Sequence, residues 1–161
     1  MAIVQSGVGL VSQHALKSSG IMEALVIGST SNRKWIEFSD AEPKGVGTPV
    51  DTYVFTVQLE NLRASTGRLD THNNFANDGR RLARLFDEMA RDWRGWKGEK
   101  AWRSTDSEVS LTFTHDGVGL VHVVVRVRGA PMANWEVTVK VPIELGSLDK
   151  LAKDVAAYFR V

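Results

Sequence analysis

The strongest constraint on the fold is a strict alternation in the second half of the sequence. Valines occupy every second position of "LVHVVVRVRG" (120–129), and "NWEVTVKVPIEL" (134–145) continues with apolar residues at its odd positions. A period of two places successive side chains on opposite faces of a strand, so both runs predict antiparallel strands with one buried face. Pro142 cannot donate a ladder hydrogen bond, which favours a sheet edge or a bend for the last strand.

Similar patterns predict two groups of three strands, each followed by a helix. The alternation from Tyr53 to Leu59 is broken at Leu62, which predicts a bulge or bend near Glu60–Asn61. The two helices have apolar faces at helical spacing and capping residues at their starts. The expected strands are 22–28, 33–40, 51–64, 107–116, 120–129 and 134–145, and the expected helices are 77–93 and 147–159.

This βββα-βββα order predicts an α+β fold. We expect a single domain built on one twisted antiparallel sheet of about six strands, with two helices packed on one face. A curled, barrel-like sheet is the alternative. The domain is expected over residues 21–161, and residues 1–20, with Lys17 as their single charge, are expected to form a weakly ordered leader.

Composition narrows the class of protein. Twenty Lys and Arg against nineteen Asp and Glu give a formal charge of +1, without the basic excess typical of proteins that bind nucleic acid or anionic membranes. The chain has no cysteine, which excludes disulfides, zinc–thiolate sites and thiol nucleophiles and fits a reducing cytoplasm. We therefore expect a cytoplasmic protein that binds neither nucleic acid nor membrane.

The segment "DWRGWKGEKAW" (92–102) holds three of the five tryptophans. Trp93 continues the apolar face of the preceding helix and is expected in the core. Trp96 and Trp102 flank a glycine-broken loop and are expected to close one end of the core. Alternatively, one of these two rings stays half exposed as an interface anchor, since tryptophan is enriched at binding hot spots.

Basic residues beside these tryptophans favour an acidic partner. A second candidate surface is the polar face of the predicted sheet. The candidate binding residues are Trp96, Lys97, Lys100, Trp102 and Arg103 in the segment, and Thr112, His122, Arg126 and Lys140 on the sheet. In the preceding helix, arginines alternate with acids, as in the i, i+4 pair Arg84–Glu88, which is typical of a solvated face.

Nothing in the sequence predicts a catalytic or metal site. The G-x-S-x-G, H-E-x-x-H and phosphate-loop motifs do not occur in it. His115–Asp116 resembles a dipeptide of metal-dependent phosphohydrolases, but it lies where a strand enters a turn, and Asp before Gly is an ordinary turn residue. We expect a non-enzymatic protein without cofactor or metal.

Three segments carry a resemblance to a family of uncharacterised small proteins common in actinobacteria. They are "RGWKGEKAWRS" (94–104), "LTFTHDGVGLVHVVVRVRG" (111–129) and "NWEVTVKVPIELGSLDKLAKDVAAYF" (134–159), within a match over about residues 23–161. The strand pattern and helix position are also distantly similar to immunity proteins that protect bacteria from their own wall-associated polymorphic toxins. The first resemblance implies no known activity, cofactor or catalytic residue, and the second implies binding of a toxin.

Together these features predict a protein-binding module of unknown specific role, such as an immunity or accessory protein. The alternative is a small enzyme or ligand-binding domain, with His115, His122 and a carboxylate converging in the concavity of the sheet. A homo-oligomer that pairs through an exposed sheet edge or through the tryptophan loop is also left open.

Overall fold

A computed structural model of the protein describes residues 22–73 and 76–161; the expected leader, 1–20, lies outside this part. The element order is ββββα twice. In chain order the elements are β1 (Ala24–Ser29), β2 (Lys34–Pro43), β3 (Val50–Leu59), β4 (Leu62–Asp70), α1 (Asp78–Arg91), β5 (Glu99–Arg103), β6 (Val109–His115), β7 (Leu120–Arg128), β8 (Glu136–Glu144), the 3-10 helix η1 (Leu145–Ser147) and α2 (Leu148–Phe159). Neither helix of the described part is long and apolar enough to cross a membrane.

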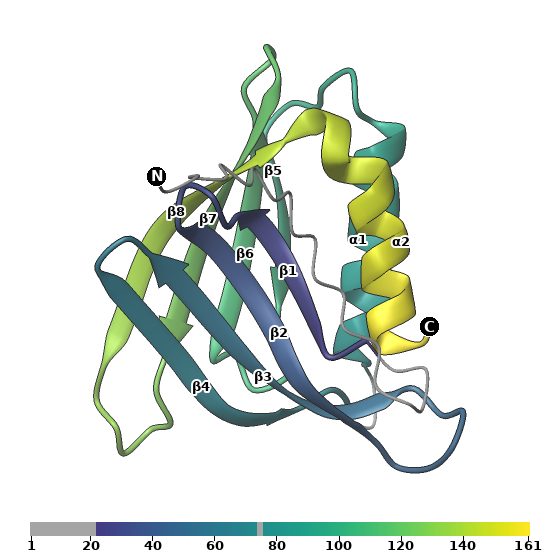
Figure 1. Cartoon of the computed structure of the whole chain (residues 1–161), viewed down its shortest axis with the longest axis vertical. Helices are drawn as coiled ribbons and strands as arrows, with labels where there is room; N and C mark the ends of the chain where they lie inside the picture. The colour runs from purple at the N-terminus through teal and green to yellow at the C-terminus, as the bar shows by residue number, and fades with distance from the viewer. Residues whose placement is uncertain (1–21, 74–75) are drawn as a thin grey trace, which may run out of the picture.

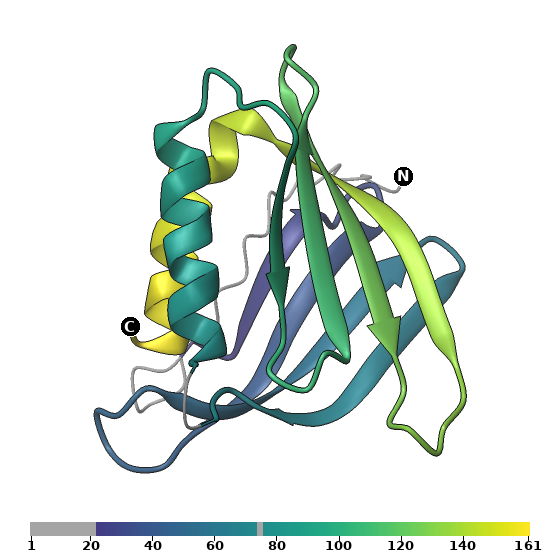
Figure 2. The same cartoon turned by 180° about the vertical axis from the view of Figure 1, so that it is seen from behind.

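The strands form two separate antiparallel sheets of four, in the orders β1-β2-β3-β4 and β5-β6-β7-β8. The sheets cross one another, and the helices lie side by side along one side of the pair (Figures 1 and 2). Helix α1 lies beside β5, and α2 lies beside β1. The α+β class is thus confirmed. The prediction of one sheet of about six strands is wrong, and the sheets do not close into a barrel.

Two strands, β4 and β5, account for the difference in strand number. Leu59 of β3 pairs with Leu62 of β4, so Glu60–Asn61 is the turn of a hairpin and not a bulge within one strand. Strand β5 lies within the segment that we expected to be a loop, and it pairs with β6 over all of its five residues. The break in alternation therefore marks a reversal of the chain.

Apolar side chains from the inner faces of both sheets and from the helices form the core. The four odd-numbered valines of β7 have no exposed surface, as their alternation predicts. The ring of Phe38 lies next to five other aromatic rings, those of Tyr53, Phe55, Trp102, Tyr158 and Phe159. At Gly79 the start of α1 meets the end of α2, because a Cβ there would lie 2.5 Å from atoms of Phe159.

Candidate functional site

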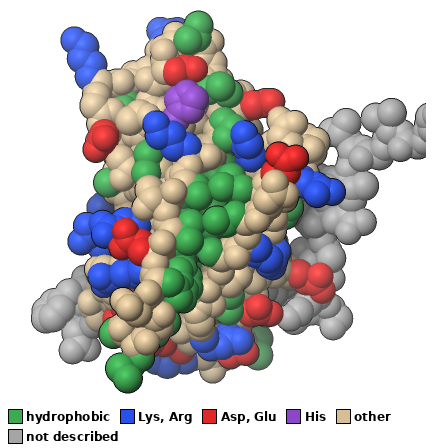
Figure 3. Space-filling model, turned by 90° about the vertical axis from the view of Figure 1, so that its left-hand side faces the viewer, with side chains coloured by type: hydrophobic (Ala, Val, Ile, Leu, Met, Phe, Trp, Pro, Cys, Tyr) green, Lys and Arg blue, Asp and Glu red, His purple; other side chains and the backbone are tan. Residues whose placement is uncertain are grey.

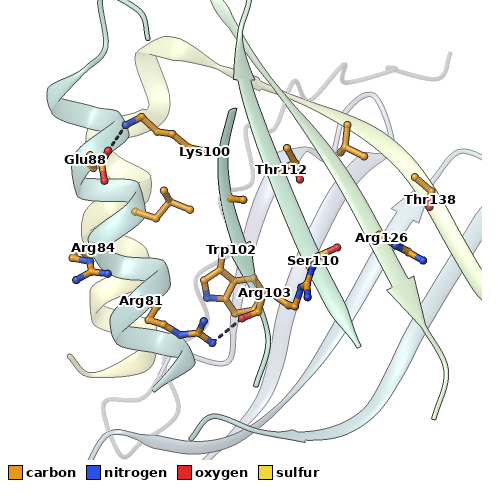
Figure 4. A pocket seen from close by; sticks show the side chains of 13 residues that line it. Arg81, Arg84, Glu88, Lys100, Trp102, Arg103, Ser110, Thr112, Arg126 and Thr138 are labelled. Carbon is orange, nitrogen blue, oxygen red and sulfur yellow. Dashed lines mark hydrogen bonds and ion pairs between the residues drawn. The ribbon is translucent and has the colours of Figure 1, made fainter. Parts of the chain in front are cut away.

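A groove of about 740 Å³ lies between α1 and the outer face of the sheet β5–β8 (Figure 4). Helix α1 forms one wall, and strand β5 lies at the base of that wall. The remaining surface comes from β6, β7 and β8. Its lining residues are Arg81, Arg84, Leu85, Glu88, Lys100, Ala101, Trp102, Arg103, Ser110, Thr112, Val124, Arg126 and Thr138.

Sheet register places the outer-face residues of the four strands in two rows, while Lys100 and Trp102 lie on the other face of β5. Each row takes one side chain from each of the four strands. One row consists of Arg103, Ser110, Arg126 and Thr138. The other consists of Ala101, Thr112, Val124 and Lys140, of which the last lies beyond the groove. Because all these residues share the outer face, the strands present hydroxyl and cationic groups together.

The lining is strongly cationic for a chain whose net charge is +1. Arginine and lysine contribute five of its side chains, and Glu88 contributes the single carboxylate. Arg126 is paired with Glu136, at 2.7 Å between Nη2 and Oε2. Arg84 and Arg103 are exposed and form no ion pair with any residue of the described part. These two guanidinium groups are therefore the cations most available to a ligand.

The N-terminal end of α1 is tied to the groove through a buried carboxylate. Asp78 is fully buried, and it accepts hydrogen bonds from the Tyr53 hydroxyl (3.1 Å), from the backbone N–H and hydroxyl of Thr105 (3.1 and 2.8 Å), and from Arg81 (2.7 Å). The same nitrogen of Arg81 donates to the backbone oxygen of Arg103, also at 2.7 Å. Arg81 thus joins the helix to β5 at the end of the groove.

Burial is the main influence on the Asp78 carboxyl. It raises the pKa of Asp78, and the hydrogen bonds from Thr105, Arg81 and Tyr53, which lower the pKa, offset it only in part. The ring of Trp102 packs beside this group with 4% of its surface exposed, and its Nε1 donates to the backbone oxygen of Asp78 at 3.1 Å. The expectation that Trp102 closes one end of the core agrees with this position.

Lys100 and Trp96 lie near the other end of α1. The ammonium group of Lys100 contacts the carboxylates of Glu88 and Asp92, the latter at 3.0 Å. Desolvation lowers the pKa of Lys100, but hydrogen bonds to both carboxylates raise it by more. The Trp96 ring, partly buried, lies 5.5 Å from the Lys100 nitrogen and edge-on to His115 at 5.1 Å. Its buried Nε1 has no hydrogen-bond acceptor among the described residues.

The structure brings five of the nine candidate residues to the groove: Lys100, Trp102, Arg103, Thr112 and Arg126. The other four, Trp96, Lys97, His122 and Lys140, do not line it. The side chain of His122 is 43% exposed and lies 3.9 Å from Asp116. His122 therefore belongs to the β6–β7 hairpin end of the sheet and not to the groove.

Two other expectations are corrected. Trp93 is 54% exposed and not part of the core, because α1 ends at Arg91 and the helical period no longer holds two residues later. Arg84 does not pair with Glu88, whose carboxylate contacts Lys100 instead. Eight of the thirteen lining residues were missed from sequence, and the cations among them are Arg81 and Arg84. Their spacing along α1 was visible, but the strand they face was not.

The His115–Asp116 dipeptide has the turn role that its sequence context suggested. One oxygen of Asp116 accepts the backbone N–H groups of Val118, Gly119 and Leu120 at 2.8 to 3.0 Å. These hydrogen bonds lower the pKa of Asp116 to about 2. His115 binds the backbone of Trp93 and Gly117, which joins the hairpin to the end of α1. Among the described residues there is no group of three or more side chains placed to hold a metal ion.

Comparison with known proteins identifies the family of the chain. The model of a family of unknown function, DUF6228, matches residues 27–161, so the chain belongs to that family. No curated protein matches. No solved structure matches. The resemblance to an uncharacterised family is confirmed by this match.

Proposed function

We propose that this member of DUF6228 is a recognition protein whose groove binds an acidic segment of another protein. The carrying observation is that two of the five cationic side chains in the groove, Arg84 and Arg103, are exposed and form no ion pair with a described residue. These two arginines come from the neighbouring elements α1 and β5 (Figure 4). An acidic segment that follows the groove can place carboxylates that accept charge-assisted hydrogen bonds from each of them.

The neutral groups of the groove suit a peptide as ligand. Ser110, Thr112 and Thr138 offer hydroxyl groups that can donate or accept, and Leu85 and Val124 offer apolar contact. Such a mixture of apolar surface and a few polar groups is typical of surfaces that recognise protein. An immunity or accessory role is the narrower form of the proposal. It rests on the resemblance in strand pattern and helix position, and it requires that the partner be a toxin inhibited by the bound chain.

A nucleic acid is the other polyanion that a cationic groove could accept. Three of the five cations already contact carboxylates: Arg81 contacts Asp78, Lys100 contacts Glu88 and Asp92, and Arg126 contacts Glu136. Affinity for nucleic acid depends on the number of phosphates neutralised. Two arginines without an ion pair can neutralise few phosphates, so we favour a short acidic stretch of protein as the ligand.

The enzyme or ligand-binding alternative required a concave site within the sheet. The inner faces of both sheets are instead filled by apolar side chains, most of them without exposed surface. His115 and His122 do not converge there, since the first contacts Trp96 and the second lies on the other face of the sheet, beside Asp116 at the hairpin end. These positions favour the binding proposal over the alternative.

The test compares two charge-reversed variants of equal net charge. Arg84→Glu/Arg103→Glu changes the groove, and Lys34→Glu/Lys153→Glu changes exposed cations that do not line it. The probe is a fluorescent peptide of ten glutamates, read by anisotropy at two salt concentrations. Lysate proteins cross-linked to each variant are identified by mass spectrometry alongside. We expect the groove variant to bind the peptide roughly 10- to 100-fold more weakly and the control to remain within about threefold of the native chain.

The same assay contains the results that would overturn the proposal. Equal losses in both variants would mean that net charge alone attracts the peptide. Tighter binding of a single-stranded oligonucleotide than of the glutamate peptide would assign the groove to nucleic acid. A cross-linked partner retained by the control and lost from the folded groove variant would identify the protein that is recognised.

A further inference from the structure

Two sheets of four strands have four edges, and two of these edges are next to other elements. The edge at β5 lies beside α1, and the edge at β1 lies beside α2 and near β8. This leaves β4 and the part of β8 that precedes its contact with β1 at Val141, on the side of the molecule away from the helices (Figures 1 and 2). That side shows a central hydrophobic area flanked by charged side chains (Figure 3). An edge strand presents unpaired N–H and C=O groups and can pair with another strand.

The β4 edge has features that oppose pairing. The register of β4 with β3 shifts between Val54 and Thr56, which marks an irregularity of the ladder. Gly67 weakens the strand, and the charged side chains in its interior, Arg63 and Arg68, have the same sign. Two copies of this edge would bring like charges together. Self-association through β4 is therefore disfavoured.

The β8 edge is regular, and its first half is open. Val141 packs close to Gly28 of β1, whereas Glu136, Thr138 and Lys140 are exposed. Strand β8 pairs with β7 over nine residues without a register shift. At the ends of this ladder the backbone hydrogen bonds are made by odd-numbered residues, Trp135 to Gly129 and Leu145 to Gly119. Hydrogen-bonded positions alternate in an antiparallel pair, so the even-numbered residues of β8 direct their N–H and C=O groups away from β7. Pro142, at an even position, fits this alternation because it needs no partner there.

Even-numbered side chains along this edge are self-complementary. Glu136, Thr138 and Lys140 are all exposed, and Val137 and Val139 between them are half-buried. If two copies meet antiparallel about Thr138, each Glu136 stands opposite the Lys140 of the other copy. The valines then face one another as non-hydrogen-bonded pairs, in which side chains approach most closely. About six backbone hydrogen bonds would join the two strands.

The charges of Glu136 and Lys140 favour this register. Neither side chain has to give up an existing ion pair to form the new contact. Lys140 forms no ion pair with any residue of the described part. Glu136 uses Oε2 for Arg126, which leaves Oε1 for a second cation. Opposite charges directly across a pair of strands stabilise it, and two-fold symmetry provides the contact twice.

We infer that the free edge of β8 is a self-association site, at which a second copy of this chain extends the sheet β5–β8 into a continuous eight-stranded sheet. Its contact is one short strand on each side, far below the area of a stable interface. The dimer is accordingly weak, with a dissociation constant on the order of 100 μM. The inference does not rest on the proposed function. Thr138 also lines the groove, but sedimentation without any peptide measures self-association separately from ligand binding.

Sedimentation velocity of the full chain, from about 10 μM to about 1 mM, tests the dimer across the expected dissociation constant. Glu136→Lys places lysine opposite lysine in both symmetric contacts and should weaken association at least about tenfold. Lys140→Glu should do the same with glutamates. The double variant Glu136→Lys/Lys140→Glu restores opposite charges and should recover association to within about threefold of the native chain.

A proline variant tests the backbone hydrogen bonds of the dimer, which the charge variants leave intact. Thr138→Pro removes the central N–H of the free edge, and it should abolish association while circular dichroism shows an unchanged fold. A monomer at every concentration would overturn the inference. So would a dimer that both single charge variants leave intact, or a double variant that fails to recover association although it is folded, because each would exclude the Glu136–Lys140 register.

Discussion

The two ends of α1 are held in the molecule by different means. At the N-terminal end Asp78 has no exposed surface, and its carboxylate is hydrogen-bonded by Tyr53, Thr105 and Arg81. Trp102 adds a hydrogen bond to the backbone of the same residue. Tyr53 and Trp102 belong to the strands β3 and β5, Thr105 to the turn after β5, and Arg81 to α1 itself. A change at this end is expected to affect the folding of the whole domain.

At the C-terminal end of the helix the contacts are half exposed. Lys100 lies between Glu88 and Asp92, both of which have about half of their side-chain surface exposed. The indole N–H of Trp96 is buried but makes no hydrogen bond to a described residue. Contacts of this kind contribute little to stability, since solvent competes for the charges. The comparison suggests that the groove is anchored at one end and adjustable at the other.

The largest effect is expected from removing the buried carboxylate. Asp78→Ala leaves the guanidinium of Arg81 without its carboxylate and leaves the hydroxyl of Tyr53 without an acceptor. The Arg81 side chain is 36% exposed, so the main cost comes from the groups of Tyr53 and Thr105 that lose their buried acceptor, about 2–4 kcal/mol of unfolding free energy. Urea denaturation followed by tryptophan fluorescence measures the loss. The control is Asp87→Ala, which removes an exposed α1 carboxylate paired with Arg91 and should cost under about 1 kcal/mol. Similar losses of stability in the two variants would contradict the conclusion that the N-terminal end of α1 is the more firmly held.

A smaller loss is expected where the same end of α1 meets α2. Gly79→Ala would normally stabilise a helix, but its Cβ would lie 2.5 Å from the Cβ and Cγ of Phe159. We expect a loss of about 1–3 kcal/mol from this overpacking. Gly146→Ala is the matched control, because nothing lies within 4 Å of a Cβ at that position. A thermal melt in which Gly79→Ala gains stability would show that the two helices separate easily.

Trp96, which precedes β5, and Trp102, which lies within it, give the sharpest contrast between the ends. Trp102→Phe loses a hydrogen bond and buried ring volume, and it should cost about 1–2 kcal/mol. Trp96→Phe removes an N–H that has no described acceptor, so its effect should be below about 0.5 kcal/mol. Chemical denaturation of both variants tests the difference. Equal costs would mean that Trp96 is held as firmly as Trp102.

Local pattern predicted the parts of the fold that depend on a single periodicity. The alternation in 120–129 and 134–145 predicted β7 and β8 and the faces on which their side chains lie. It did not predict β4 as a separate strand, because β3 and β4 reverse at a turn without glycine or proline. Nor could it show that the strands before and after α1 form separate sheets, which depends on contacts between distant segments. Strand β5 has only five residues and follows a glycine, so its period is too short to detect.

The candidate site could be predicted from sequence only in part, for the same reason. Thr112 and Arg126 were recognised because strand alternation determines their face. Arg81 and Arg84 were not, because their role depends on α1 lying beside a strand that the pattern did not reveal. Trp93 was misplaced because the end of α1 is set by its capping contacts and not by the apolar period that precedes it.

The smallest expected effect is a pH dependence of stability. It separates the contribution of the Asp78 charge from the contribution of its hydrogen bonds. Because burial raises the pKa of this carboxyl in the folded chain, its contribution to stability is fully present below the unfolded pKa of about 3.9 and declines as the pH rises through the folded value. Asp78→Asn carries no charge at any of these pH values. The stability of the native chain relative to this variant should therefore increase from pH 7 to pH 4, as measured by urea denaturation at each pH. A decrease would show that the hydrogen bonds from Thr105 and Arg81 outweigh burial, and that the anchored end of α1 is stabilised by charge.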